Sequence, residues 1–308
     1  MQHPTSAAGR ALRIAVVIPH LNQPAMLARC LASLRAGRRQ PDEIIVVDNG
    51  SAVPPQAICD AVPGVKLLHE AQPGPGPARN LGVKAAMGEV LAFLDADCLA
   101  DPAWLAEAAT ALADPQAMIL GGDVRIAWAD PARLTMLEAY ESIYAYRMDR
   151  YIAREGFTGT GNLVVRQGVL DKVGPFAGIG IAEDRDWGQR ATALGFVIRY
   201  VPDMKVYHPA RQTFAELARK WDRQTAHDYV KARGASGRLR FALKALAMAP
   251  SPLVELPRLL TSDRIHGFRS RALAFGALTR IRAYRAGLML RLLAGADPDT
   301  LSGRWNRE

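Results

Sequence analysis

Short runs of apolar, β-branched residues, each followed by polar residues, constrain the fold of this chain most strongly. Such runs occupy residues 14–18, 43–47 and 90–94, and stretches with helical periodicity lie between them at 24–34 and 78–87. Strands that are apolar on both faces belong to sheets covered on both sides, and alternation of strands and helices is typical of parallel sheets. We therefore predict an α/β fold, with a mostly parallel Rossmann-like sheet and helices on both faces.

The three strongest predicted strands all end in polar clusters, at residues 19–22, 48–51 and 95–97. Ligands of such sheets collect at the carboxyl ends of the strands. Asp95 and Asp97 are separated by one residue, so in extended backbone they point the same way. Two carboxylates held together repel each other, and a divalent cation that also carries phosphate is the usual compensation. The pair predicts a Mg²⁺ or Mn²⁺ site, and a surface turn capped by aspartates is the alternative.

The positive charge of the chain is concentrated in its last third. The 308 residues carry 39 Lys+Arg and 30 Asp+Glu, a net charge of +9. Residues 209–308 hold 19 Lys+Arg and 8 Asp+Glu, which leaves 20 and 22 for the rest, so the two parts carry +11 and −2. This asymmetry favours a local anionic partner.

The cysteines and the apolar runs predict a cytoplasmic protein. Cys30, Cys59 and Cys98 are widely spaced and fit neither a disulfide framework nor a zinc site, as expected in a reducing compartment. The run at 14–18 is too short for a signal peptide, and no stretch is long and apolar enough for a transmembrane helix.

Six motifs in a fixed order carry a family resemblance. They occupy residues 17–22, 45–51, 76–82, 94–97, 161–166 and 183–187. With this order and spacing, the chain resembles family 2 glycosyltransferases of the GT-A fold over residues 14–210. The resemblance implies a metal-dependent, inverting transfer of a sugar from a UDP- or dTDP-linked donor to a cell-envelope glycan or lipid-linked acceptor.

The resemblance also implies the residues that hold the donor. Pro19 and Asn22 would shape the wall around the nucleotide base, and Asp48 would accept a hydrogen bond from a base N–H. Arg79 would bridge base and phosphate oxygens, and Asp95 would face the ribose. A plain turn at Asp48 and a solvated helix residue at Arg79 are the alternatives.

The metal and the proton transfer are assigned in the same way. Asp97 would bind Mg²⁺ or Mn²⁺, and His208 would reach the metal or the diphosphate. A purely structural histidine is the alternative at position 208. Asp184 would be the base that takes the proton of the acceptor hydroxyl, although Glu183 and Asp186 are close enough in sequence to be mistaken for it.

Four further residues are expected to line the sugar or acceptor pocket: Gly161, Asn162, Glu183 and Trp187. Trp187 offers a flat apolar face to a sugar ring, and a position in the core is the alternative.

The predicted organisation has three parts: a nucleotide-sugar-binding half at 1–110, an acceptor-binding half at 111–212, and a basic amphipathic helical region at 213–308. One helix is expected over 134–151. Basic amphipathic helices bind anionic membranes, so we predict peripheral association with the inner face of the plasma membrane. A helical subdomain whose arginines are merely solvated is the alternative. Nucleic acid is not expected, because no array of base-stacking aromatics is present.

Two other functions are compatible with parts of the sequence. A sugar-nucleotide nucleotidyltransferase would share the fold, but its phosphate loop is rich in glycine and lysine, and residues 19–24 contain neither. A non-catalytic membrane-associated adaptor of the same fold would use the basic third, but the intact acids argue against loss of the site. Gly74 and Gly76 lack the third glycine of a dinucleotide fingerprint.

Overall fold

The computed structural model describes residues 12–232 and 234–298, and these form two compact units. The sheet unit comprises residues 12–125 and 146–208. The helical unit comprises residues 126–145 together with the described chain after residue 208. The segment 126–145 therefore packs with the C-terminal helices, although it lies within the predicted acceptor-binding half.

One eight-stranded sheet, ordered β3-β2-β1-β4-β7-β6-β8-β5, organises the described chain. Its strands are β1 Ile14–His20, β2 Glu43–Asp48, β3 Val65–His69, β4 Val90–Leu94, β5 Leu99–Ala100, β6 Ile119–Ala127, β7 Asn162–Arg166 and β8 Ile198–Pro209. The first four in spatial order are parallel, as predicted, whereas β7 is antiparallel to both β4 and β6 and β5 is antiparallel to β8.

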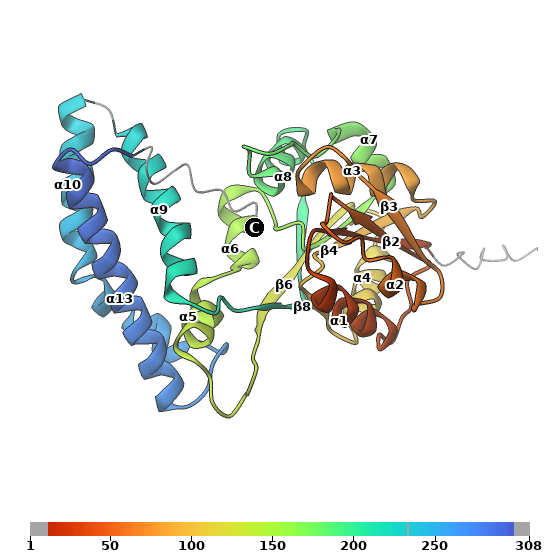
Figure 1. Cartoon of the computed structure of the whole chain (residues 1–308), viewed down its shortest axis with the longest axis horizontal. Helices are drawn as coiled ribbons and strands as arrows, with labels where there is room; N and C mark the ends of the chain where they lie inside the picture. The colour runs from red at the N-terminus through yellow and green to blue at the C-terminus, as the bar shows by residue number, and fades with distance from the viewer. Residues whose placement is uncertain (1–11, 233, 299–308) are drawn as a thin grey trace, which may run out of the picture. The chain divides into compact units, whose positions relative to one another are not determined.

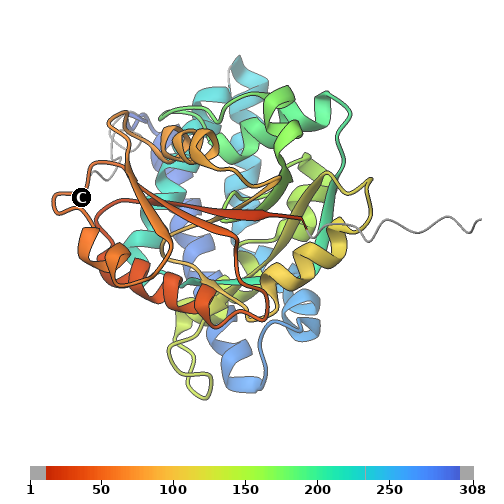
Figure 2. The same ribbon diagram turned by 90° about the vertical axis from the view of Figure 1, so that its right-hand side faces the viewer.

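Helices cover both faces of the sheet, which confirms the predicted α/β class (Figure 2). One face carries α1 Pro24–Arg35, α2 Gln56–Asp60 and α4 Trp104–Leu112. The opposite face carries α3 Pro75–Ala85, α7 Gln167–Val173 and α8 Glu183–Ala193.

The alternation along β1 explains why its sequence is apolar throughout. Val16 and Ile18 pack on the side of α1, while Ala15 and Val17 pack on the opposite side, and all four are fully buried. Because both faces are covered, polar residues are placed where the strand ends. The carboxyl ends of β1, β2 and β4 therefore form the polar edge of the sheet unit.

The helical unit contains α5 Met136–Tyr144, α9 Phe214–Lys231, α10 Gly234–Met248, α11 Ser251–Val254, α12 Leu256–Thr261 and α13 Phe268–Leu293. The long helix α13 packs against α5, α9 and α10 (Figure 1). Thr135 begins α5 with a capping box, because its hydroxyl accepts from the Glu138 backbone N–H while the Glu138 carboxylate accepts from the Thr135 N–H. No described helix has both the length and the hydropathy needed to cross a bilayer.

The single helix expected over 134–151 is wrong. Helix α5 ends at Tyr144, Ala145 is extended, and Tyr146 adopts a left-handed conformation with φ of 48° before α6 begins at Met148 and runs to Glu155. The helical periodicity of the sequence is continuous here, so it does not reveal the break. The break lies at the boundary between the two units, and the Tyr146 ring contacts His208. A left-handed non-glycine residue persists only where its surroundings hold it.

Candidate active site

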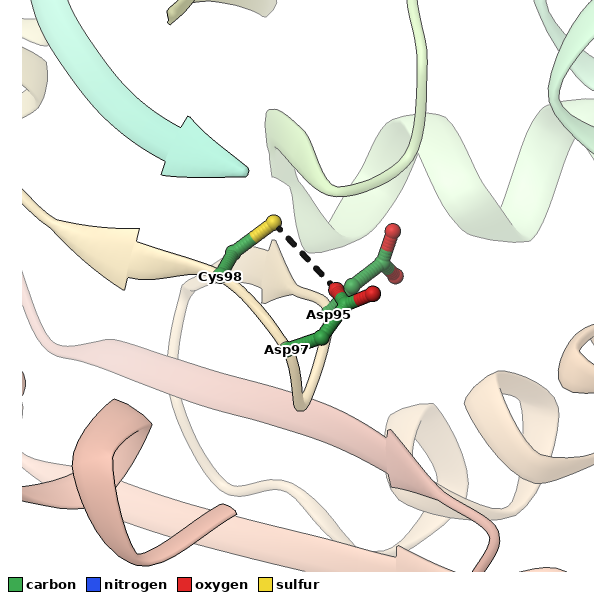
Figure 3. Close-up of side chains that lie close together, drawn as sticks. All are labelled: Asp95, Asp97 and Cys98. Carbon is green, nitrogen blue, oxygen red and sulfur yellow. Dashed lines mark hydrogen bonds between the residues drawn. The ribbon is translucent and has the colours of Figure 1, made fainter. Parts of the chain in front are cut away.

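Asp95 and Asp97 lie together just beyond the end of β4, with Cys98 beside them (Figure 3). One ligand atom from each of these three residues lies within 4.8 Å of the others. Burial raises the pKa of the Asp97 carboxyl, and the neighbouring Asp95 raises it further, while His208 opposes both effects. The crowded pair is therefore the kind of site that a cation stabilises.

The donor set favours a hard cation over a soft one. Burial, followed by the charges of Asp95 and Asp97, raises the pKa of the Cys98 thiol well above its usual range in the metal-free protein. The Cys98 Sγ lies 3.6 Å from Asp97 Oδ1 as a weak donor. The other two candidate ligands are carboxylates, whose hard oxygens suit Mg²⁺ or Mn²⁺.

His208 reaches the same place from β8, which pairs with β5 immediately after Cys98. Its Nε2 lies 3.4 Å from Asp97 Oδ2. The Tyr146 ring lies against the imidazole, with centroids 4.5 Å apart, and the tyrosine hydroxyl is 3.1 Å from Nε2. The break between α5 and α6 thus places the ring and the hydroxyl of Tyr146 against His208.

Arg79 connects the strand-end pair to the acids of α8. Its two terminal nitrogens contact Asp95 Oδ1 at 2.7 Å and Glu183 Oε1 at 2.8 Å. Burial alone would lower the pKa of this guanidinium, but the two carboxylates raise it above its usual value. A direct contact with base or phosphate, as the resemblance implies, would require these ion pairs to open.

The acids at the start of α8 have different partners. Glu183 pairs with Arg79, and Asp186 pairs with Arg190 at 2.9 Å along the same helix. Asp184 accepts a hydrogen bond from the Arg185 backbone N–H at 2.7 Å, and no basic side chain within the described ranges forms an ion pair with it. Burial and then Glu183 raise the pKa of the Asp184 carboxyl. Of the three acids, Asp184 is thus the one that has no basic partner among the described residues.

Asp48 lies at the end of β2 in contact with a histidine that the sequence reading did not single out. Gln23 N–H donates to His20 Nε2 at 3.2 Å, so the proton of the neutral ring sits on Nδ1 and is donated to Asp48 Oδ1 at 3.0 Å. Ser51 N–H donates to Oδ2. Burial would raise the pKa of Asp48, but hydrogen bonds from Ser51 and His20 lower it. The Asp48 carboxylate is therefore stabilised in its ionised form, and its oxygens have lone pairs that can accept further hydrogen bonds.

The loops after β1 and β2 are tied together at this edge. Asn22, with a left-handed φ of 52°, receives a hydrogen bond at Oδ1 from Ala52 N–H at 2.9 Å, and its own N–H donates to Ser51 Oγ at 2.8 Å. Pro19 is partly exposed beside the buried His20. The residues predicted to surround the base thus belong to two loops that are hydrogen-bonded to each other.

Comparison with known proteins decides the family. The model of "Glycosyl transferase family 2" matches residues 15–179. Glycosyltransferase AglE of Haloferax volcanii is 33% identical over 215 residues, which cover 67% of this chain and 70% of that protein. The chain belongs to glycosyl transferase family 2.

One further relative is a glycosyltransferase, and two solved structures share the fold. The pre-mycofactocin glycosyltransferase of Mycobacterium tuberculosis is 28% identical over 241 residues, covering 71% of this chain and 47% of that protein. The mannosyltransferase PcManGT of Pyrobaculum calidifontis, solved with GDP-Man and Mn²⁺, superposes with a TM-score of 0.57 at 17% identity, covering 94% of this chain and 89% of that one. S. aureus TarS residues 1–349, solved with UDP-GlcNAc, gives 0.52 at 18% identity, covering 96% and 93%. The predicted GT-A fold is confirmed.

Two of the residues expected to line the pocket of this glycosyltransferase lie in its core instead. Trp187 is 1% exposed, packs against Phe176, and donates its indole N–H to Gly174 O at 3.1 Å. Its ring therefore cannot act as a platform for a sugar. Asn162 is fully buried, so its side chain does not line a pocket either.

Gly161 touches the site through its backbone. A Cβ at this position would lie 2.5 Å from Asp95 Oδ2, closer than real Cβ contacts. Glycine therefore permits the approach of β7 to the strand-end aspartates, and its predicted part in the pocket remains a prediction.

Asn162 crosslinks three parts of the sheet unit. Its Oδ1 accepts from Trp104 Nε1 at 2.8 Å, and its Nδ2 donates to Asp123 O at 2.9 Å and Met204 O at 2.8 Å.

We expect Asn162→Ala to lower the free energy of unfolding by about 3 kcal/mol, because the substitution leaves the buried indole N–H and two buried carbonyl oxygens without their hydrogen-bond partner. Chemical denaturation measures this loss of stability. A variant with normal stability that no longer binds the sugar donor would show instead that Asn162 contacts the donor.

Proposed function

We propose that this glycosyltransferase is a metal-dependent, inverting enzyme that transfers a hexose or deoxyhexose from a UDP- or dTDP-sugar. The observation that carries the proposal is the chain of contacts Asp95–Arg79–Glu183, which joins the strand-end pair to the helix start where Asp184 lies. A carboxylate with a raised pKa thus stands in the same unit as a carboxylate pair suited to a cation.

The donor would be held along the polar edge of the sheet unit. Asp48 accepts the base N–H with its remaining lone pairs, next to Pro19 and the Asn22 loop. Asp95 faces the ribose. Asp97 and His208 would hold Mg²⁺ or Mn²⁺, and the cation would supply positive charge to neutralise the leaving diphosphate.

Transfer would proceed by a single in-line displacement. The acceptor hydroxyl oxygen attacks the anomeric carbon as the bond from that carbon to the phosphate oxygen breaks. Asp184 takes the hydroxyl proton, and the nucleoside diphosphate leaves with the electrons of the broken bond. One displacement inverts the anomeric configuration. The ion pairs of Arg79 with Glu183 and Asp95 would hold the start of α8, where Asp184 lies, close to the strand-end aspartates.

The acceptor would be a cell-envelope glycan or a lipid-linked saccharide, used at the inner face of the plasma membrane. Support comes from the +11 charge of residues 209–308 and from Leu239, Leu243 and Leu246 of α10, which are 61, 57 and 64% exposed. Their spacing places them on one stripe of the helix, opposite the residues that pack on α13. An exposed apolar stripe beside basic residues suits a lipid surface.

The donor and the stereochemistry are tested with the purified chain. We expect thermal stabilisation by UDP or dTDP with Mn²⁺, its loss with EDTA, and release of the nucleoside diphosphate from one donor in a panel of UDP-, dTDP- and GDP-sugars. NMR of the product should show inverted anomeric configuration. No nucleotide binding and background turnover across the panel would refute the proposal.

A further inference from the structure

The helical unit holds two basic side chains around one indole ring. The guanidinium carbon of Arg285, on α13, lies 3.7 Å from the centroid of the Trp221 ring, and Lys220 Nζ lies 5.7 Å from it. Arg285 is only 8% exposed. Burial, and then the charge of Arg282, lower the pKa of Arg285 to about 10. A buried cation that lacks an acidic partner is costly.

The carboxylates nearby are already engaged by other groups. Glu141 pairs with Arg211, whose guanidinium and backbone N–H both donate to it. Asp228 accepts from Lys244 Nζ at 2.9 Å and from Gln224 at 3.0 Å. Within the part of the chain that the structure describes, no carboxylate forms an ion pair with Arg285 or Lys220. The cluster therefore has positive charge in excess.

Two buried donors of this cluster, Arg285 Nε and Thr225 Oγ1, have no hydrogen-bond partner, whereas the Trp221 indole N–H has the Tyr140 hydroxyl as an acceptor. Trp221 and Thr225 are four residues apart on α9, so they lie on one face of that helix. Asp228 is one turn further along and feels the charge of Arg285. Arg285 therefore faces the same stretch of α9. Buried polar groups are nearly always paired, so the two unpaired donors of Arg285 and Thr225 call for an acceptor.

We propose that Lys220, Trp221, Thr225 and Arg285 form a binding site for a phosphate oxyanion. A guanidinium and an ammonium supply charge, the Thr225 hydroxyl supplies a neutral donor, and the Trp221 ring holds Arg285 in place, which matches the several acceptor oxygens of phosphate. The phosphate belongs either to a lipid headgroup or lipid-linked saccharide, or to a soluble ion. None of these residues has a part in the proposed donor site, so the inference stands independently of it.

The test compares two arginine variants of the full chain. In Arg285→Met the buried charge is removed, and in Arg291→Gln an exposed charge on the same helix is removed as the control. We expect inorganic phosphate, in EDTA, to stabilise the wild type and Arg291→Gln against heat. Arg285→Met should keep its melting temperature without phosphate and bind phosphate at least tenfold more weakly. Lys220→Gln, at an exposed position, repeats the test should Arg285→Met fold poorly.

Sedimentation with vesicles distinguishes the sources of the phosphate. Vesicles of phosphatidylcholine alone are compared with vesicles that also contain phosphatidic acid. Loss of binding to the acidic vesicles in Arg285→Met, but not in Arg291→Gln, identifies a lipid phosphate, whereas loss of phosphate affinity alone identifies a soluble one. Equal behaviour of the two variants in both assays overturns the proposal, as does a wild type that binds neither. Nucleotide binding with Mn²⁺ should be unchanged in both variants.

Discussion

Replacing Asp184 with Asn is expected to lower the rate of sugar transfer by about 10³–10⁴-fold while leaving donor affinity within a few-fold of wild type. The amide keeps the shape of the side chain but cannot take the acceptor proton. Turnover under donor saturation measures the rate, and thermal shift with nucleotide and Mn²⁺ measures binding.

Asp186→Asn is the matched control, because it makes the same change two residues away on α8. Asp186 pairs with Arg190, so this variant should lose some stability and keep turnover within a few-fold. Equal loss of turnover in both variants, or loss of donor binding in Asp184→Asn alone, would remove Asp184 from the role of base.

The pH profile provides a second test of the same role. Burial and Glu183 raise the pKa of Asp184, and the protonated carboxyl cannot accept a proton. Turnover should therefore fall as the pH drops through a value above the usual range of an aspartate, and it should be constant above that value. The residual activity of Asp184→Asn should lack this acid limb. An acid limb that persists in the variant would belong to another group.

Replacing Asp97 with Asn is expected to abolish stabilisation by Mn²⁺ and to lower transfer by roughly 10³-fold, since about 4 kcal/mol of charge stabilisation is lost. Without metal, the variant should melt at or above the wild-type temperature. The raised pKa means that folding disfavours the ionised form of Asp97, so the charge destabilises the metal-free fold above its folded pKa.

Asp114→Asn is the control for this substitution, since Asp114 forms an exposed ion pair with Arg199. It should retain the full Mn²⁺ effect and near-normal turnover. A Mn²⁺-dependent rise in melting temperature that persists in Asp97→Asn would place the metal elsewhere.

The strand-end residues could be predicted because their signal is local. An apolar run that stops at Leu94 fixes where β4 ends, and the following Asp95 and Asp97 must lie at the edge of the sheet. The same argument located Asp48 after β2. His20 stood in an equivalent cluster, but its contact with Asp48 depends on the parallel pairing of β1 with β2.

Residues whose partners are distant in sequence could not be assigned in this way. Tyr146 falls within a continuous helical pattern, so the sequence does not predict that the helix breaks there. The contact between its ring and His208 involves a residue far away in the sequence and is visible only in the folded structure. Trp187 and Asn162 belong to sequence motifs of the family, but their side chains are buried in the core. Aromatic and amide groups serve a core or a pocket equally well, and burial decides between them.

The sequence by itself determined the family, the α/β fold and the edge of the sheet where the acids of the glycosyltransferase gather. Only the tertiary structure decided how those acids differ. Arg79 reaches from α3 to pair with Glu183 and Asp95, and Arg190 pairs with Asp186, whereas Asp184 forms no ion pair within the described residues and its pKa is raised by burial and by Glu183. Spacing along a chain determines which residues share an element, but the protonation of a carboxyl depends on burial and on charges brought close by folding.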